Sequence, residues 1–174
     1  TKDQYFDVIR QIYPWKTESL SQIKNWQIPL WNPYNFSGSP LLANFQSAIF
    51  YPLNFFYFLT SQINAWTILV MCQPLLAGIF TYFFASQIGL SKRGSLFSGV
   101  VFSYSLFIAV FTEYNTINQT ILWLPLILLA VHKLTEKINK LWVIVFIFAS
   151  LSSLFAGHLQ LFSGVYGLAI IYGL

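Results

Sequence analysis

Residues 28–54, IPLWNPYNFSGSPLLANFQSAIFYPLN, directly precede about a hundred residues of almost continuous apolar sequence. The stretch contains four prolines, and each of them removes a backbone donor and disfavours helical geometry at the residue before it. It is also rich in Trp, Tyr and Phe, which settle where one end of the side chain is apolar and the other is hydrated. The stretch therefore predicts an ordered loop that lies on a membrane surface and is attached to a helical membrane domain.

The composition of the whole chain agrees with a membrane protein. Of its 174 residues, 56% are hydrophobic, 20% aromatic and only 8% charged, whereas an ordinary soluble domain has about 25% charged residues. No basic stripe or recognisable motif indicates a nucleic-acid partner, and the single cysteine, Cys72, excludes an internal disulfide. The polar start without Met and the apolar end at Leu174 predict a fragment of a larger polytopic protein.

Five apolar segments are candidates for membrane spans, and a helix needs about 20 such residues to cross a bilayer. The third is short and contains Pro125, which predicts a kinked or re-entrant segment. The expected fold class is all-α, a polytopic transmembrane helical bundle. Residues 1–63 form a first extracytoplasmic loop with juxtamembrane helices, and residues 64–174 form the bundle. The five segments run over residues 64–87, 95–112, 119–132, 141–157 and 159–174.

Charges in the short loops predict the orientation. Lys92 and Arg93 fall in one loop, and Lys133, Lys137 and Lys140 fall in another loop on the same side. Because basic loops are retained in the cytoplasm, this side is expected to be cytoplasmic. Residues 1–63, Glu113 and His158 are then expected on the outer side.

Three helices are expected in the outer loop. The first covers residues 3–13 and ends at Pro14, and the second begins at a Thr17 cap. A third starts at Pro40 and continues to residue 50. Gly38 is expected to be a turn residue with positive φ.

A family resemblance is carried by motifs that run through almost the whole chain. The YfhO family of bacterial membrane proteins has motifs similar to Asp7-x-x-x-Gln11-x-Tyr13-Pro14-Trp15, Pro29-Leu-Trp-Asn-Pro33-Tyr34, Phe36-x-Gly38-x-Pro40-Leu-Leu-Ala-Asn44, Gln46 and Phe50-Tyr-Pro-Leu-Asn54. Gly157-His158-x-Gln160 resembles a further recurrent piece, although Leu159 stands where the family commonly has proline.

The resemblance implies a GT-C type glycosyltransferase in the bacterial cytoplasmic membrane. Such enzymes use a polyprenyl-phosphate-linked sugar at the outer membrane face, here with a cell-envelope glycopolymer or protein as acceptor. An acidic residue in the first outer loop serves as the catalytic base, and Asp7 is the matching position. An inverting transfer needs one carboxylate to take the proton of the acceptor hydroxyl.

The charged residues of the outer loop have competing interpretations. Asp7 is either the base, a solvated acid or the partner of Arg10. Asp3 and Asp7 are a weak candidate pair for a divalent cation, and Asp3 is otherwise an exposed acid. Arg10, Lys16 and Lys24 are candidates to hold the lipid-linked phosphate, or else they contact lipid head groups.

The remaining candidates are polar or aromatic residues for sugar binding. Their alternatives are structural: amides that satisfy loop backbone, and aromatics of the interfacial belt. Glu113 is a site candidate because it is an acid close to the membrane, and His158 either contacts substrate or caps a helix. His132, at the cytoplasmic end, is expected to be structural. The sugar-binding candidates are Gln11, Trp31, Asn32, Tyr34, Asn44, Gln46 and Asn54.

Two rival functions remain open. A transporter or flippase for lipid-linked sugars predicts ionisable residues in the middle of spans, but every charge in residues 64–174 lies at a predicted span end. A non-catalytic assembly module predicts that residues 28–54 are a docking surface, that Asp7 is dispensable, and that changes at Trp31 or Phe50 disrupt a complex.

Overall fold

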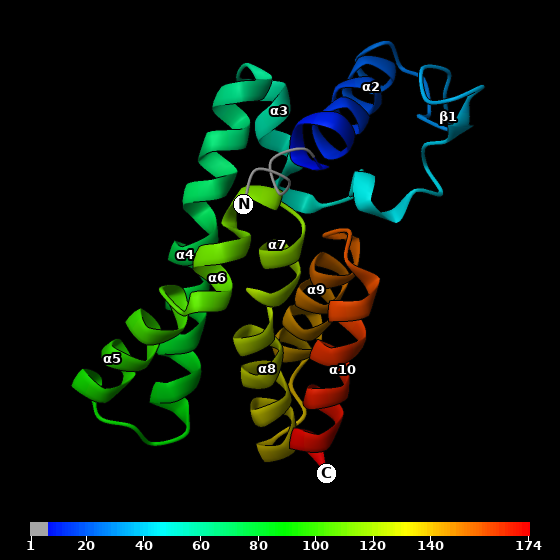
Figure 1. The fold of residues 1–174 in the computed structure, drawn as a ribbon. Helices are drawn as coiled ribbons and strands as arrows, with labels where there is room; N and C mark the ends of the chain where they lie inside the picture. The colour runs from blue at the N-terminus through cyan, green and yellow to red at the C-terminus, as the bar shows by residue number, and fades with distance from the viewer. Residues whose placement is uncertain (1–6) are drawn as a thin grey trace.

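The computed structural model describes residues 7–174 as a helical protein with one short β-hairpin (Figure 1). We call residues 7–61 the platform and α4 to α10 the bundle. The platform consists of η1 (Val8–Ile12), α2 (Tyr13–Lys24), β1 (Trp31–Asn32), β2 (Ser39–Pro40), η2 (Phe45–Ser47), η3 (Pro52–Phe55) and α3 (Phe56–Leu59). The bundle consists of α4 (Gln62–Gln87), α5 (Lys92–Ser103), α6 (Leu106–Phe111), η4 (Thr112–Tyr114), α7 (Ile117–Ile121), α8 (Leu124–Glu136), α9 (Lys140–Phe155) and α10 (Leu159–Gly173).

Three helical stretches are long and apolar enough to cross a membrane: Gln62–Gln87, Lys92–Tyr114 and Ile117–Glu136. The all-α class predicted from the sequence is therefore confirmed, and these three stretches indicate a membrane protein. The helices α9 and α10 are apolar but shorter, with 16 and 15 residues. Their assignment as fourth and fifth spans stays a prediction.

The second and third stretches are not continuous helices. The second is interrupted at Tyr104, between α5 and α6, which the sequence did not indicate. The third is interrupted at Leu122 and Trp123, close to the expected kink. Pro125 lies in the first turn of α8, where its missing N–H costs no helical hydrogen bond.

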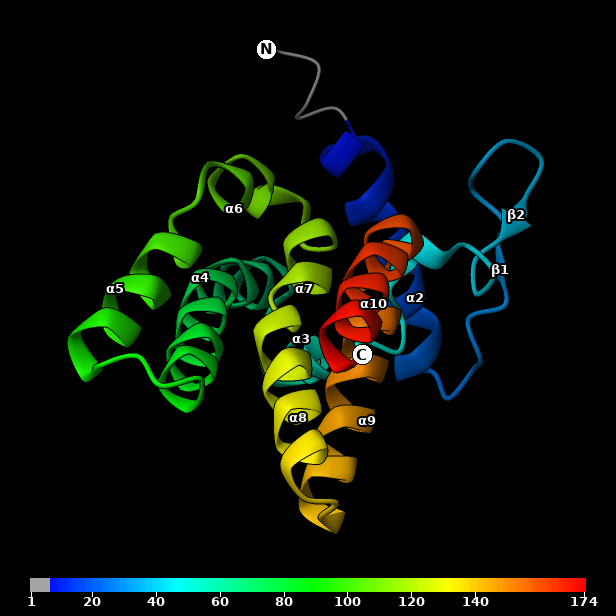
Figure 2. The same cartoon turned by 90° about the horizontal axis from the view of Figure 1, so that it is seen from below.

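The helices alternate in direction, so the platform and the basic loops lie at opposite ends of the bundle. In Figure 1 α4 runs downward from the platform, α5 and α6 return, α7 and α8 descend, α9 returns and α10 descends. The turns that carry Lys92, Arg93 and Lys137 therefore lie at the lower end, which we call the basic end. The view from below shows α4–α6 on one side and α7–α10 on the other, and α4 packs against α8 between them (Figure 2).

Small residues allow α4 and α5 to approach closely. A Cβ atom added to Gly99 of α5 would lie 2.8 Å from the carbonyl oxygen of Gly78 in α4. Ser103 Oγ donates to the carbonyl oxygens of Pro74 and Gly99, both at 2.8 Å. Between apolar helices in lipid, such close backbone contact and interhelical hydrogen bonds replace hydrophobic burial as the source of association.

The platform differs from its predicted helices in three places. Pro14 does not end a helix but lies in the first turn of α2, which continues directly from η1. Thr17 is not a cap: it lies inside α2, where its Oγ1 donates to the Tyr13 carbonyl oxygen at 2.9 Å. The expected helix over residues 40–50 is reduced to the single turn of η2.

The hairpin turn confirms the expectation for Gly38, which has a φ of +103°. A Cβ atom added there would lie 2.5 Å from Nε1 of the Trp31 indole, so only glycine leaves room for this ring.

Candidate functional site

Two acids predicted as site residues, Asp7 and Glu113, are brought together at the platform end of the bundle. Asp7 begins η1, and η1 contacts η4, which contains Glu113 and Tyr114. The charges of Asp7 and Glu113 both act on the Tyr114 phenol. Asp7 is exposed and Glu113 is half-buried, so this group of oxygen atoms can be reached by a ligand from the platform side.

A break in the second apolar stretch places Glu113 and Tyr114 beside η1. The chain reverses at Asn115, whose φ of +52° is in the left-handed region that asparagine tolerates better than most residues. Asn115 Oδ1 accepts from the side-chain amides of Gln73 in α4 and Gln119 in α7. Its Nδ2 donates to the Trp66 carbonyl oxygen at 3.3 Å. These bonds tie the reversal to two helices and so hold η4 in place.

Buried polar side chains follow Asn115, where the sequence predicts the connection between the second and third spans. Asn118, Gln119 and Thr120 are almost fully buried, with exposed fractions of 0–2%, and form part of α7. Asn118 Nδ2 donates to the Ile108 carbonyl oxygen at 2.6 Å, which satisfies a backbone group at the α6–η4 break.

An apolar groove opens next to Asp7, between η1 and the first turns of α4. It has a volume of about 420 Å³ and is lined by Val8, Ile9, Tyr13, Ile63, Trp66 and Thr67. The rings of Tyr13 and Trp66 lie 5.7 Å apart and form its wall. With this lining the groove suits a hydrocarbon chain better than a sugar.

A second groove, with more polar side chains, lies along α2. It is lined by Tyr13, Pro14, Thr17, Glu18, Asn32, Tyr34 and Asn35, and its volume is about 380 Å³. Tyr13 lines both grooves. An apolar and a polar groove that share one side chain fit an amphipathic ligand, with its chain in one and its polar head towards the other.

Lys16, predicted as a possible phosphate ligand, is buried instead, with an exposed fraction of 5%. Its Nζ donates to the carbonyl oxygens of Ser47 at 2.7 Å and Ala48 at 3.2 Å, and to Asn54 Oδ1 at 3.3 Å. It also lies 5.7 Å from the centre of the Tyr57 ring. Burial lowers the pKa of Lys16 to about 7, while the three acceptors stabilise its ammonium form and oppose that shift. Lys16 thus clamps residues 47–57 to α2.

Two predicted sugar ligands, Asn32 and Asn54, have structural contacts, and so does His158, which was expected either to contact substrate or to cap a helix. Asn32 is buried, and its Oδ1 accepts from Tyr34 N at 2.9 Å within the hairpin turn. Asn54 is buried, and its Nδ2 donates to the Ala48 and Ile49 carbonyl oxygens. His158 caps α10, where its Nδ1 accepts from Leu161 N at 3.4 Å.

The predicted site residues form three separate groups rather than one site. Asp7, Arg10 and Gln11 belong to the first turns of the platform, where Glu113 joins them. Trp31, Asn32 and Tyr34 belong to the hairpin and its turn. Asn44 is the N-cap of η2 and Gln46 lies within η2. A Cβ atom added to Gly157, in the turn before α10, would lie 3.4 Å from Gln46 Cα, so η2 packs on this turn, and His158 is the next residue of the chain.

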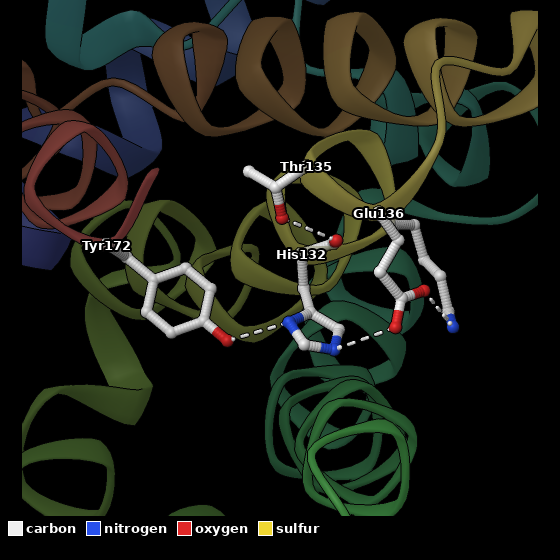
Figure 3. Close-up of polar contacts among 5 residues, drawn as sticks. His132, Thr135, Glu136 and Tyr172 are labelled. Atoms are coloured by element: carbon white, nitrogen blue, oxygen red, sulfur yellow. Dashed lines mark hydrogen bonds and ion pairs between the residues drawn. The ribbon is translucent and has the colours of Figure 1, made fainter. Parts of the chain in front are cut away.

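A polar cluster at the basic end joins α8 to α10 (Figure 3). The Tyr172 hydroxyl lies 3.1 Å from His132 Nδ1, and His132 Nε2 lies 3.6 Å from Glu136 Oε1. Lys133 Nζ also pairs with Glu136, at 2.9 Å. The cluster lies at the opposite end from the platform, in keeping with the structural role expected for His132.

Residues 7–174 contain no group of three or more His, Cys, Asp or Glu residues that would hold a metal ion. Asp3, half of the weak cation pair suggested by the sequence, lies outside the described residues. The divalent-cation hypothesis therefore has no support from the part of the chain that is described.

Comparison with known proteins assigns no family: no protein-family model, curated protein or solved structure matches the chain. The resemblance to the YfhO family stays a prediction.

Two residues of the candidate site had no signal in the sequence. Tyr114 is an ordinary member of an aromatic-rich chain, and Asn115 is one of several asparagines. Only the contact between η1 and η4, and the amide bonds behind it, gives these residues a place in the site.

Proposed function

We propose that the chain belongs to a GT-C type membrane glycosyltransferase. It would move a sugar from a polyprenyl phosphate to a cell-envelope acceptor at the outer face of the bacterial cytoplasmic membrane. The observation that carries the proposal is the position of Asp7. This acid lies in the platform directly before η1, which contacts η4 with Glu113 and Tyr114, at the end of an apolar stretch long enough to span a membrane. It also directly precedes Val8 and Ile9, which line an apolar groove.

Asp7 would act as the general base. As the acceptor oxygen attacks the anomeric carbon, the Asp7 carboxylate takes the hydroxyl proton, and the bond from that carbon to the phosphate oxygen breaks. A positioned base of this kind contributes about 10²–10⁴-fold to the rate. The polyprenyl phosphate leaves as an anion that needs little protonation, so one carboxylate suffices. Glu113 is then left to hydrogen-bond a sugar or acceptor hydroxyl.

The two grooves that meet at Tyr13 would hold the donor. Its isoprenoid chain would lie against Val8, Ile9 and Trp66, and its polar head would face α2. Arg10 is one helical turn from Asp7 and has the donor geometry that suits phosphate oxygens. It is the better phosphate candidate because Lys16 is buried in the clamp.

The charges of the loops support an orientation in which the platform faces the exterior. The basic end carries Lys92, Arg93, Lys133, Lys137 and Lys140, and such loops are retained in the cytoplasm. The platform, at the opposite end, would then face the exterior, where lipid-linked sugars meet envelope acceptors.

The test uses the full-length protein in cells whose own copy of the gene is deleted. Asp7→Asn keeps the shape of the side chain and removes its basicity, and Glu136→Gln removes a carboxylate at the basic end as a matched control. Monosaccharide analysis of the envelope polymers should show a sugar lost with Asp7→Asn and retained with Glu136→Gln and wild type. The polyprenyl-phosphate sugar should accumulate where it can be oxidised by periodate added from outside.

Two results would contradict the proposal. If the Asp7→Asn variant keeps the wild-type sugar content, Asp7 is not the base. Accumulation of the lipid-linked sugar only on the inner leaflet would indicate a transporter instead. Equal expression and melting temperature of the two variants would show that the difference is not one of folding.

A further inference from the structure

The loop that joins α2 to β2 exposes its apolar side chains to an unusual degree. We call residues 26–38 the aromatic loop. Trp26 is 98% exposed, Phe36 103% and Tyr34 80%, and Ile28 and Leu30 are also more than half exposed. A globular protein rarely shows so many large apolar groups together unless the surface meets another apolar phase.

This exposure is not a consequence of disorder. The strands β1 and β2 pair with Trp31 opposite Pro40, and Leu41 N donates to the Leu30 carbonyl oxygen at 2.9 Å. Gln22 Nε2 donates to the Trp31 carbonyl oxygen at 2.8 Å and fixes the hairpin to α2. The aromatic loop is therefore held in one place by the platform while its side chains remain uncovered.

The aromatic loop projects sideways from the platform, beyond the outline of the bundle. In Figure 1 the hairpin lies at the upper right, past α10, and in Figure 2 it is the part of the chain farthest to the right. The side surfaces of the spanning helices face hydrocarbon. The aromatic loop overhangs these surfaces at the platform end and does not lie above the helices α4–α10.

The charges of the sequence fit a lipid surface. No Asp, Glu, Lys or Arg occurs from Asn25 to Ser91, so the aromatic loop itself carries no charge. Glu18 of α2 lines a groove together with Tyr34 and Asn35 of the loop. Along the chain the nearest charge is Lys24, an exposed lysine at the end of α2, whose ammonium suits a lipid phosphate. Aromatic side chains interleaved with asparagine suit the boundary between head groups and acyl chains.

We propose that the aromatic loop is a membrane anchor that inserts Trp26, Ile28 and Phe36 into the lipid leaflet at the platform end. The anchor ties the free side of the platform to the bilayer, while the Lys16 clamp ties the other side to residues 47–57. It is independent of the proposed glycosyltransferase activity and holds for any function of the platform.

The experiment places an environment-sensitive fluorophore on the loop in the full-length protein. In a Cys72→Ser background, Phe36→Cys and, separately, Trp26→Cys are labelled with NBD. The proteins are reconstituted in phosphatidylcholine–phosphatidylglycerol vesicles with or without acyl-brominated lipid. Both side chains are exposed, so the substitutions remove no packing. Lys137→Cys, in the exposed turn at the basic end, is the matched control.

The anchor predicts blue-shifted NBD emission at positions 36 and 26, with a clear loss of emission in brominated lipid. The label on Lys137→Cys should emit as NBD does in water, and it should lose less of its emission in brominated lipid. Water-like, unquenched emission at both loop positions would overturn the proposal. Blue-shifted emission that brominated lipid does not quench would also overturn it, because it would show that protein covers the loop.

Discussion

Replacing Lys16 with methionine tests the clamp that docks residues 47–57 on α2. The variant keeps an unbranched side chain and removes the amine. In the wild type, burial lowers the pKa of Lys16 from 10.5 to about 7. Between these two values the unfolded chain binds more protons than the folded chain, so the free energy of unfolding rises with pH.

The size of this effect follows from the two pKa values. Between pH 7 and pH 9 linkage gives a rise of about 2 kcal/mol for one lysine with these values. The three acceptors around Nζ stabilise the ammonium form and make this an upper figure. The lysine contribution is complete only well above pH 10.5, where the unfolded lysine has also lost its proton.

The assay is SDS-driven unfolding of the purified full-length protein in mild detergent, followed by far-ultraviolet circular dichroism at pH 7, 8 and 9. The free energy of unfolding of the wild type, relative to Lys16→Met, should rise by up to about 2 kcal/mol over this range. Other titrating groups cancel in the difference. Lys24→Met, an exposed lysine of the same helix, should follow the wild type. Parallel pH profiles for wild type and Lys16→Met would refute the desolvated clamp.

Three further changes test other contacts of the fold. Burial raises the pKa of Tyr57, whose hydroxyl has no hydrogen-bond partner among residues 7–174, so wild-type stability should fall above pH 10. Tyr57→Phe should reduce that fall in the same assay and change stability at pH 7 by less than about 1 kcal/mol. Gly99→Ala should destabilise the α4–α5 contact by about 1–3 kcal/mol, because its Cβ would meet an α4 carbonyl oxygen. The control Gly164→Ala has open space around the new Cβ and should not lower the melting temperature. Asn115→Ala leaves two buried glutamine amides without their shared acceptor and should cost about 2–4 kcal/mol in SDS titrations; a wild-type midpoint would contradict that network.

Much of the membrane domain was predictable because local composition decides it. A run of about 20 apolar residues is stable as a helix in lipid whatever its neighbours are, so α4 and the outline of the next two spans followed from hydropathy. The positive φ of Gly38 was predictable for a similar reason, because it depends on one residue in a turn.

The candidate site was only partly predictable. Asp7 was singled out by the family resemblance and Glu113 as an acid near the membrane, but the contact between η1 and η4 depends on a helix break that no local signal marked. Lys16 was wrongly expected at the surface, since lysine is rarely buried without a partner charge. Its partners are carbonyl and amide oxygens 31–38 residues away, which a local pattern cannot reveal.

Composition and local pattern are enough to predict a helical membrane protein with an aromatic, uncharged segment before its first long span, and basic loops that alternate with loops without Lys or Arg. These properties depend on how each stretch partitions between water and lipid, which is a sum over neighbouring residues. The residues that the platform buries, the acids near its first turns and the place where the two grooves meet follow from the tertiary structure. Such contacts join residues far apart in the chain, and their energies depend on packing and hydrogen-bond geometry that no single stretch contains.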